Sequence, residues 1–340
     1  MKITDIDIRM CRHKETGMKD SEMRDGKKSD LEFLVITFHT DEGLSSSTFG
    51  FAGRGAAMAG EIANSIFKPF FIGRDPLYRE KHWHEYRTAD RWWNHAPIYS
   101  YGPFDINCWL LSSMKAEQPL YKYLGAYRDS VPIYGSSLVL KTPDAYAKEA
   151  LEYKNRGFNA YKLHPPGDYD FDLEAHKAVR KAVGDDFKLM SDPVAPYTFE
   201  QALRFGRELE KLNYYWYEEP LFDENFHNLR ELTRILDIPI VGTEVLAKHP
   251  YSVAECISTR VVDVVRADPS WSGGITATMK TAHLAESFGV SCEIHTAIYH
   301  PLELVNLHCC AAIKNCEFFE VLLPYELFNF GLKKGRRKTA

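Results

Sequence analysis

From Val131 to about residue 325, one pattern repeats: a short apolar segment, typical of a buried strand, is followed by an amphipathic, helix-like segment. The eight strand-like segments are VPIYGSS, NAYKLH, FKLMSD, YYWYEE, IPIVGTE, VVDVVRAD, SCEIH and CEFFEV. The repeat length, about 25–30 residues, is that of a β/α unit, and such units form parallel sheets. Eight units in succession predict a (β/α)₈ TIM barrel over residues 131–325, in preference to an open doubly wound sheet.

Residues 1–130 lack this repeat and predict a separate α+β domain. The segments MKITDIDIRMC and LEFLVITFHTDEG alternate apolar and polar residues, like two antiparallel strands. The polar stretch between them, HKETGMKDSEMRDGKKSD, is typical of a long loop. Helix-like segments containing Gly and Ala follow, and then the aromatic-rich run RWWNHAPIYSYGPF.

Composition excludes several classes of function. The formal net charge of −5 and the pI near 6.2 give no general attraction to nucleic acids or anionic membranes. No apolar run reaches the ~18–20 residues of a membrane span, and the start, MKITDIDIRM, is acidic where a signal peptide is apolar. No Gly-x-Gly-x-x-Gly motif follows a strand. The seven cysteines include no CxxC pair, so we expect a cytoplasmic protein without disulfides.

Three acidic residues at successive strand ends predict a metal site, because functional residues in such a barrel lie at the carboxyl ends of the strands. They are Asp192, Glu218 and Glu244, the second and third each 26 residues after the one before. Three converging negative charges repel one another unless a cation neutralises them, and Mg²⁺ prefers carboxylate oxygens. The alternative is that each acid pairs with a neighbouring helix. Glu219 is not included, since strand alternation points it away from Glu218.

Candidate acid–base residues lie at the other strand ends. Lys162 and His164 are two residues apart, so both face the same side of one strand. Lys162 can stabilise charge or act as a base, and His164 can act as a base, an acid or a hydrogen-bond donor. His295 and Asp268 end neighbouring strands, where a carboxylate fixes the tautomer of an imidazole and raises its pKa. Glu320, on the last strand, is a weaker candidate, because it can simply pair with Lys162.

Together these segments resemble the enolase superfamily and, within it, the mandelate racemase-like subgroup. The matching stretches are YKLHPPG, LMSDP, YWYEEP, IPIVGTE, RADPSWSGGIT and EIH. The resemblance covers residues 130–325 and extends more loosely to IGRDPLYREKHW and EQPLYKYLG, which look like the family's capping domain. It implies that residues 1–130 form this capping domain and that its loops set substrate specificity.

The resemblance also implies the roles of the site residues. The three carboxylates bind Mg²⁺, Lys162 flanks the substrate on one side, and the His295–Asp268 pair flanks it on the other. Members of the family abstract a proton α to a carboxylate. His164 stands where many members have a second lysine, which leaves the base on that face open. After LLPYELFNFGLKK the sequence ends in GRRKTA, so we expect residues 326–340 to be a truncated C-terminal tail.

The implied activity is that of a Mg²⁺-dependent lyase, which dehydrates a sugar acid to a 2-keto-3-deoxy acid. One base removes the α-proton, and one acid protonates the departing β-hydroxyl. Among enzymes, the alternatives are a racemase or epimerase, with a base on each face, and a cycloisomerase. The alternative of another class is a non-catalytic relative that kept the fold. The expected partner is a small carboxylate substrate, not nucleic acid or a membrane, and we expect a homo-oligomer.

Overall fold

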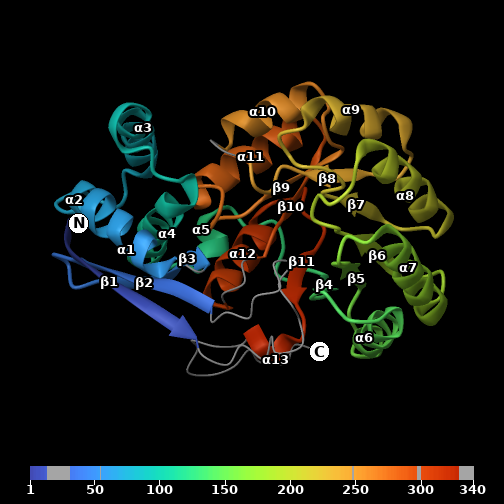
Figure 1. Cartoon of the computed structure of the whole chain (residues 1–340). Coiled ribbons are helices and arrows are strands. Elements are labelled where there is room, and N and C mark those ends of the chain that lie inside the picture. The colour runs from blue at the N-terminus through green and yellow to red at the C-terminus, as the bar shows by residue number, and fades with distance from the viewer. Residues whose placement is uncertain (14–30, 54, 247–248, 297–299, 329–340) are drawn as a thin grey trace.

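The computed structural model of the chain describes residues 1–13, 31–53, 55–246, 249–296 and 300–328. It contains a three-stranded antiparallel sheet near the N-terminus and an eight-stranded parallel sheet (Figure 1). The parallel sheet curves into a nearly closed barrel. The predicted fold class, a TIM barrel with an N-terminal α+β domain, is therefore confirmed.

The N-terminal sheet has the order β1-β2-β3, formed by Ile3–His13, Leu31–Thr40 and Ser45–Gly53. The two strands predicted from alternation are β1 and β2, and they pair antiparallel as expected. The third strand was not predicted, because its inward residues include Ser46 and Thr48, which hide the apolar period. Most of the predicted polar loop between β1 and β2 lies outside the described residues.

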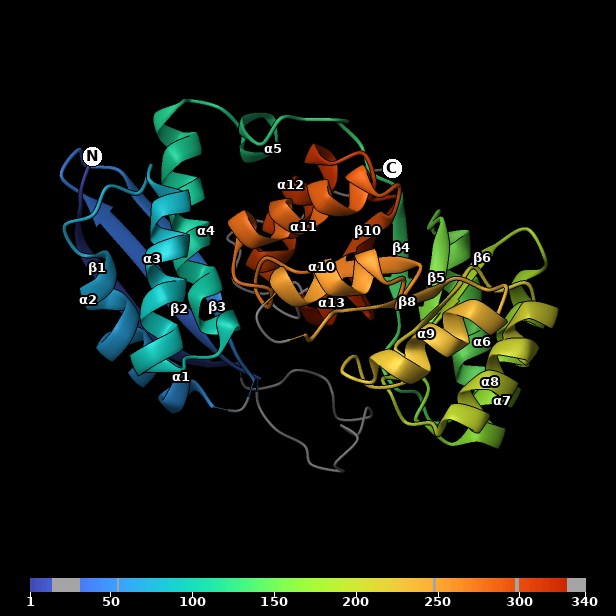
Figure 2. The ribbon, with the colours of Figure 1, turned by 90° about the horizontal axis from the view of Figure 1, so that it is seen from above.

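Helices α1–α4 lie on one side of this sheet (Figures 1 and 2). The helical elements of the domain are α1 Ala56–Ile62, the π-helix η1 Ala63–Phe67, α2 Lys68–Phe71, α3 Arg79–Ala89, the π-helix η2 Asp90–Asn94, α4 Ile98–Lys115 and α5 Leu120–Tyr123. Large aromatic side chains fill the space between the layers. The rings of Tyr86 and Tyr101 stack with centroids 4.3 Å apart, and Phe71 stacks on Phe104 at 5.5 Å.

The barrel strands follow the order β10-β9-β8-β7-β6-β5-β4-β11, and every neighbouring pair is parallel. Each contains part of one predicted strand: β4 Ile133–Ser136, β5 Ala160–Leu163, β6 Lys188–Ser191, β7 Trp216–Glu218, β8 Ile240–Gly242, β9 Val264–Ala267, β10 Ser291–Ile294 and β11 Phe319–Leu322. The Cys292 N–H donates to the Asn315 carbonyl at 2.7 Å, which ties β10 to the segment that leads into β11. The predicted domain boundary at 130/131 falls between α5 and β4, and it stays a prediction.

Amphipathic helices surround the barrel (Figure 2). They are α6 Pro143–Asn155, α7 Tyr169–Val183, α8 Phe199–Lys211, α9 Phe226–Ile235, α10 Tyr251–Ser258, α11 Ile275–Ser287, α12 His300–Ala312 and the short α13 Tyr325–Phe328. Helix α8 shows why they form. The Thr198 side chain and Gln201 make a capping box at its start, and Ala202, Phe205 and Leu209 bury one face against the strands. Residues 329–340 of the predicted tail lie outside the described residues.

The two parts of the molecule are joined by a buried polar contact. Asp105 of α4 accepts hydrogen bonds from the backbone N–H and the hydroxyl of Thr276 at 2.8 and 2.7 Å, and Thr276 lies in the first turn of α11. The Trp109 indole donates to the same hydroxyl at 2.9 Å. These bonds fix the N-terminal domain against the barrel.

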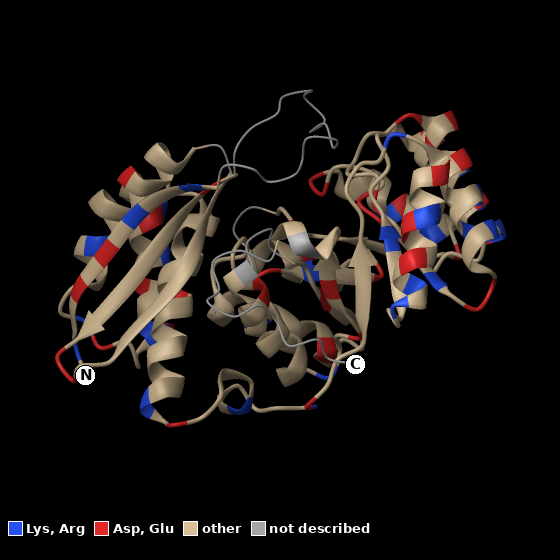
Figure 3. Ribbon diagram, turned by 90° about the horizontal axis from the view of Figure 1, so that it is seen from below, with Lys and Arg blue, Asp and Glu red and all other residues tan. Residues whose placement is uncertain are grey.

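The surface and the cysteines agree with the composition. Lysine, arginine and acidic residues are mixed along the outer helices (Figure 3). No helix in the described part of the chain combines the length and the apolar character needed to span a bilayer. All seven cysteines are free in the structure, six of them buried.

Candidate active site

The parallel strands bring the predicted site residues to one rim of the barrel. Each lies in or within two residues of the strand that carries it: Lys162 and His164 on β5, Asp192 after β6, Glu218 on β7, Glu244 after β8, Asp268 after β9, His295 after β10 and Glu320 on β11. The carboxylates and Lys162 are buried, whereas the side chains of His164 and His295 keep 20% and 13% exposure. The two histidines are thus the acid–base groups that solvent reaches.

Lys162 lies at the centre of the cluster. Its Nζ is 3.0 Å from Asp192 Oδ2, 3.0 Å from Glu218 Oε2 and 2.9 Å from Glu320 Oε1. Burial by itself lowers the pKa of Lys162, but the charges of Glu218 and Glu320 outweigh it and raise the pKa well above its ordinary value. Lys162 is therefore a fixed positive charge in this arrangement. Glu320 forms an ion pair with it, which is the simpler of the two roles considered for Glu320 in the sequence analysis.

A second buried cation, Arg266 on β9, was not among the predicted residues. Its Nε is 2.7 Å from Glu218 Oε1, and its Nη2 is 2.6 Å from Glu320 Oε2. Its Nη1 donates to the Tyr134 hydroxyl at 3.3 Å. Sequence reasoning could have found it, because Arg266 is two residues before Asp268 and so shares its face of the strand.

His295 and Asp268 form the expected pair. His295 Nδ1 is 2.8 Å from Asp268 Oδ2, while Asp268 Oδ1 accepts bonds from the Ser270 N–H at 2.6 Å and hydroxyl at 2.7 Å. Because a carboxylate accepts, Nδ1 carries a proton and Nε2 faces the site, 3.3 Å from Glu244 Oε1. Burial lowers the pKa of His295, but Glu244 and the bond to Asp268 raise it overall to about 9.

His164 is held in a similar way at the opposite side. Its Nδ1 is 2.7 Å from the Ser137 carbonyl, which only accepts, so Nδ1 carries a proton. Its Nε2 lies 2.9 Å from Asp192 Oδ2. Both histidines therefore present Nε2 toward the carboxylate cluster, one from β5 and one from β10.

Strained backbone surrounds the three candidate metal ligands. Val194 and Ala195, just after β6, have φ of 58° and 54°, Glu219 has 40°, and Thr243 has 78°. These non-glycine residues occupy the left-handed region, which costs free energy and tends to occur at functional sites. Each lies within three residues of a candidate ligand, so the strain marks the same three strand ends as the carboxylates.

Two further buried carboxyl groups support this cluster. Asp223 accepts bonds from the Thr243 N–H at 2.7 Å and the Val245 N–H at 3.1 Å, and so fixes the loop that carries Glu244. No spacing in the sequence pointed to Asp223. Burial raises the pKa of Glu219 well above its ordinary value, and the charge of Glu244 raises it further. Its left-handed φ takes Glu219 out of the strand pleat, so alternation does not separate it from this cluster.

The donor set fits a divalent cation in its chemistry. Glu218 Oε1 is buried and is held by the ion pair with Arg266 Nε at 2.7 Å. Burial, together with the charges of Glu218 and Asp192, raises the pKa of Glu244 to about 7, against the opposing effects of His295 and Arg266. A cation bound here would favour the charged form of Glu244, and carboxylate oxygens are the ligands that Mg²⁺ prefers. Among the described residues, no three ligands form a ready coordination shell, and Lys162 and Arg266 contact these carboxylates instead.

Known proteins share this fold and much of the sequence. The family described as enolase C-terminal domain-like matches residues 145–338. The arabinonate dehydratase of Saccharolobus solfataricus is 30% identical over 78% of this chain and 74% of that protein. The L-talarate/galactarate dehydratase of Salmonella typhimurium is 30% identical over 94% of this chain and 82% of that protein.

Solved structures and more distant relatives extend the comparison. The crystal structure of D-glucarate dehydratase from Agrobacterium tumefaciens complexed with magnesium is 33% identical, with a TM-score of 0.84 over 97% of this chain and 89% of that one. A hydrophobic dipeptide epimerase of Enterococcus faecalis is 27% identical over 79% of this chain and 75% of that protein, so other reactions occur among the relatives. The family match, the dehydratase relatives and the strand-end motifs agree: the chain belongs to the enolase superfamily, in its mandelate racemase-like subgroup.

Proposed function

We propose that this chain is an acid-sugar dehydratase, a lyase that converts a sugar acid to a 2-keto-3-deoxy acid. The observation that carries the proposal is the pair of acid–base groups at one rim, His164 and the His295–Asp268 pair, on either side of a buried carboxylate cluster. The relatives named as arabinonate and L-talarate/galactarate dehydratases support the substrate class.

Asp192, Glu218 and Glu244 would hold the Mg²⁺ that the family implies. When bound, Mg²⁺ supplies positive charge beside the substrate carboxylate and makes the α-proton more acidic. The chain adds its own cation: Lys162, fully buried and in contact with two of these ligands, places a fixed positive charge where negative charge develops.

The base in this proposal is His164, on the β5 side, and Lys162 stays a cation beside it. His164 removes the α-proton, and the electron pair left at the α-carbon moves into the bond to the carboxyl carbon. His164 suits this step because its Nδ1 is fixed by the Ser137 carbonyl, which leaves Nε2 as the reacting atom.

The acid is His295, on the β10 side. A proton on Nε2 passes to the departing β-hydroxyl, which leaves as water, and the resulting enol rearranges to the 2-keto acid. Throughout the reaction, Asp268 accepts a hydrogen bond from the protonated Nδ1 and so fixes the orientation of the imidazole ring. Two hydrogen bonds donated by Ser270 keep the Asp268 carboxylate in position. The net change is loss of one water from the substrate.

A racemase or epimerase is the second candidate, because one specific observation favours it. His164 and His295 approach the cluster from different strands, each with Nε2 inward, which provides a base on each face. In that reaction the proton returns on the opposite face and no hydroxyl leaves. Both reactions use the two acid–base groups, and the relatives named as dehydratases, at 30% identity against 27% for the epimerase, favour the dehydratase.

The decisive experiment incubates the purified protein with Mg²⁺ and a library of sugar acids, and assays 2-keto acid with semicarbazide. Formation of keto acid from one substrate supports the dehydratase. Exchange of the α-proton in D₂O without keto acid supports the epimerase, a changed carbon skeleton without loss of water supports a cycloisomerase, and a folded protein that does none of these supports a non-catalytic relative. The cytoplasmic location and the homo-oligomer stay predictions.

A further inference from the structure

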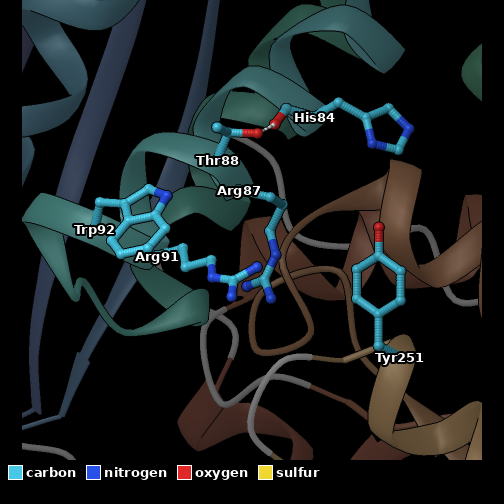
Figure 4. A pocket seen from close by; sticks show the side chains of 6 residues that line it. All are labelled: His84, Arg87, Thr88, Arg91, Trp92 and Tyr251. Atoms are coloured by element: carbon cyan, nitrogen blue, oxygen red, sulfur yellow. Dashed lines mark hydrogen bonds between the residues drawn. The ribbon is translucent and has the colours of Figure 1, made fainter.

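A cavity lies outside the barrel rim, where the N-terminal domain meets the outer helices of the barrel (Figure 4). It measures about 550 Å³. Its lining comes from α3, η2 and the start of α10: His84, Arg87, Thr88, Arg91, Trp92 and Tyr251. None of these residues belongs to the strand-end cluster, and none is acidic.

Two arginines without an acidic partner define the chemistry of this cavity. Arg87 and Arg91 are one helical turn apart, and Figure 4 shows both guanidinium groups extending to the same side, between Trp92 and Tyr251. Within the part of the chain that the structure describes, neither forms an ion pair with a carboxylate, and Arg87 Nε is buried without a hydrogen-bond partner. Two like charges at this spacing repel, and an anion between them would remove the repulsion.

Aromatic rings form the walls beside these charges. The Arg87 guanidinium lies 5.7 Å from the Tyr251 ring, and that of Arg91 lies 5.2 Å from the Trp92 ring. Trp92 and Tyr251 are 64% and 55% exposed, so each leaves apolar surface in contact with water. An organic group beside the anion would cover this surface.

The backbone at the cavity is irregular. Arg91 and Trp92 lie in η2, a π-helix that continues α3 and closes with a bond from the His95 N–H to the Asp90 carbonyl at 3.2 Å. His95 follows with a left-handed φ of 48°. π-Helical turns are rare and occur frequently at functional sites. This turn changes the direction in which Arg91 and Trp92 leave the helix, and both line the cavity.

We propose that this cavity is a binding site for a phosphate monoester, separate from the proposed active site. The phosphate lies between Arg87 and Arg91, whose two charges match its charge of about −2 and whose planar groups donate paired hydrogen bonds. The organic part lies against Trp92 and Tyr251. Since Tyr251 belongs to the barrel and the arginines to the N-terminal domain, the bound ligand bridges the two.

The test is isothermal titration of the Mg²⁺-loaded protein with phenyl phosphate and with inorganic phosphate. Binding of both is expected, tighter for phenyl phosphate because its ring covers the aromatic walls. Arg87→Gln and Arg91→Gln should each weaken both affinities about tenfold or more. Trp92→Ala should weaken phenyl phosphate and leave inorganic phosphate unchanged.

Arg204→Gln is the matched control, because Arg204 also lies over an aromatic ring, that of Tyr169 at 5.4 Å, but on α8. Its affinities should stay within about twofold of the parent chain. If Arg87→Gln does not fold by circular dichroism, Arg87→Lys and Arg91→Gln replace it. Absence of binding at millimolar phosphate overturns the proposal, and so does binding that both arginine variants retain, which would place the anion at the metal. Neither outcome depends on which reaction the barrel catalyses.

Discussion

The guanidinium of Arg266 contacts the carboxylate of Glu218 inside the barrel, with Nε 2.7 Å from Oε1 and both side chains fully buried. The same guanidinium reaches Glu320 on β11, so one arginine links the candidate metal ligand to the strand that closes the barrel. Both carboxylates are buried, so bulk solvent does not reach them to replace this contact. Arg266 therefore holds Glu218 in place before any cation binds.

Replacing Arg266 with Met should destabilise the protein by about 3–5 kcal/mol, because it leaves two carboxylates buried without their partner. Arg266→Met/Glu320→Gln, which removes one of those charges, should recover part of the loss. Urea unfolding followed by circular dichroism measures both. Arg260→Met is the matched control, since Arg260 pairs with Asp263 at 3.2 Å on the surface and should cost less than about 1 kcal/mol. Equal effects of the two single variants would contradict a role for the buried contact.

Glu218→Gln should weaken Mg²⁺ binding by about a hundredfold, and Asp192→Asn and Glu244→Gln should do the same, because each removes a charged oxygen ligand. Glu219→Gln is the neighbouring control and should leave the affinity within about tenfold. Titration calorimetry of the EDTA-treated protein gives these affinities directly. A larger loss of Mg²⁺ affinity in Glu219→Gln than in Glu218→Gln would show that Glu219, and not Glu218, is the ligand. Full activity in excess EDTA would show that the reaction needs no metal.

His295→Asn should abolish turnover while leaving the fold and Mg²⁺ binding intact, because the imidazole carries the transferred proton and is not one of the candidate metal ligands. Asp268→Asn should also lower kcat strongly, since an amide at this position donates to Nδ1 and favours the wrong tautomer. Circular dichroism and steady-state kinetics on the substrate found in the library screen test both variants. An unimpaired His295→Asn enzyme would exclude the pair from the mechanism.

Exchange of the α-proton with D₂O shows which side of the site supplies the base, the β5 side with Lys162 and His164 or the β10 side with His295. If His164 is the base and Lys162 stabilises the charge that develops, His295→Asn should still exchange the α-proton while forming no keto acid, and Lys162→Ala should lose exchange. NMR of the substrate after incubation in D₂O measures this. Exchange retained only by Lys162→Ala would show that the roles of the two faces are reversed.

His176 should make stability depend on pH. Burial lowers its pKa in the folded chain from 6.5 to about 4. Below pH 6.5 the unfolded chain binds a proton that the folded chain does not, so the free energy of unfolding falls as pH drops toward 4, by up to about 3 kcal/mol. His176→Gln should remove this share of the fall, whereas exposed His227→Gln should not change the slope. Urea unfolding at several pH values between 4 and 7 measures how the free energy of unfolding depends on pH in each variant.

Particular residues show how far the sequence leads toward this site. The amino-acid pattern alone predicts that Lys162, Asp192, Glu218, Asp268 and His295 lie on one rim, because each follows an apolar segment and parallel strands end at the same edge. The same-face rule that pairs Lys162 with His164 also applies to Arg266, although Arg266 was not among the predicted residues.

Glu219 shows where the same-face rule for strand residues stops applying. Alternation holds only within the pleat, and the left-handed φ of Glu219 places this residue beyond it. Likewise Asp223 lies 21 residues before Glu244, and only the loop bonds to Thr243 and Val245 bring it to the site. Such contacts depend on how loops return across the rim, and no local period records that path.

The sequence by itself determined the eight strands, the barrel and the ionisable residues at seven of the eight strand ends, because these follow from local periodicity and from the parallel arrangement it forces. Only the tertiary structure decided which charges meet. It placed Lys162 among three carboxylates, joined Arg266 to Glu218 and Glu320, and set Arg87 and Arg91 beside Tyr251 of another domain. Electrostatic energy depends on distances of a few ångströms and on burial, and residues far apart in the chain acquire both only when it folds.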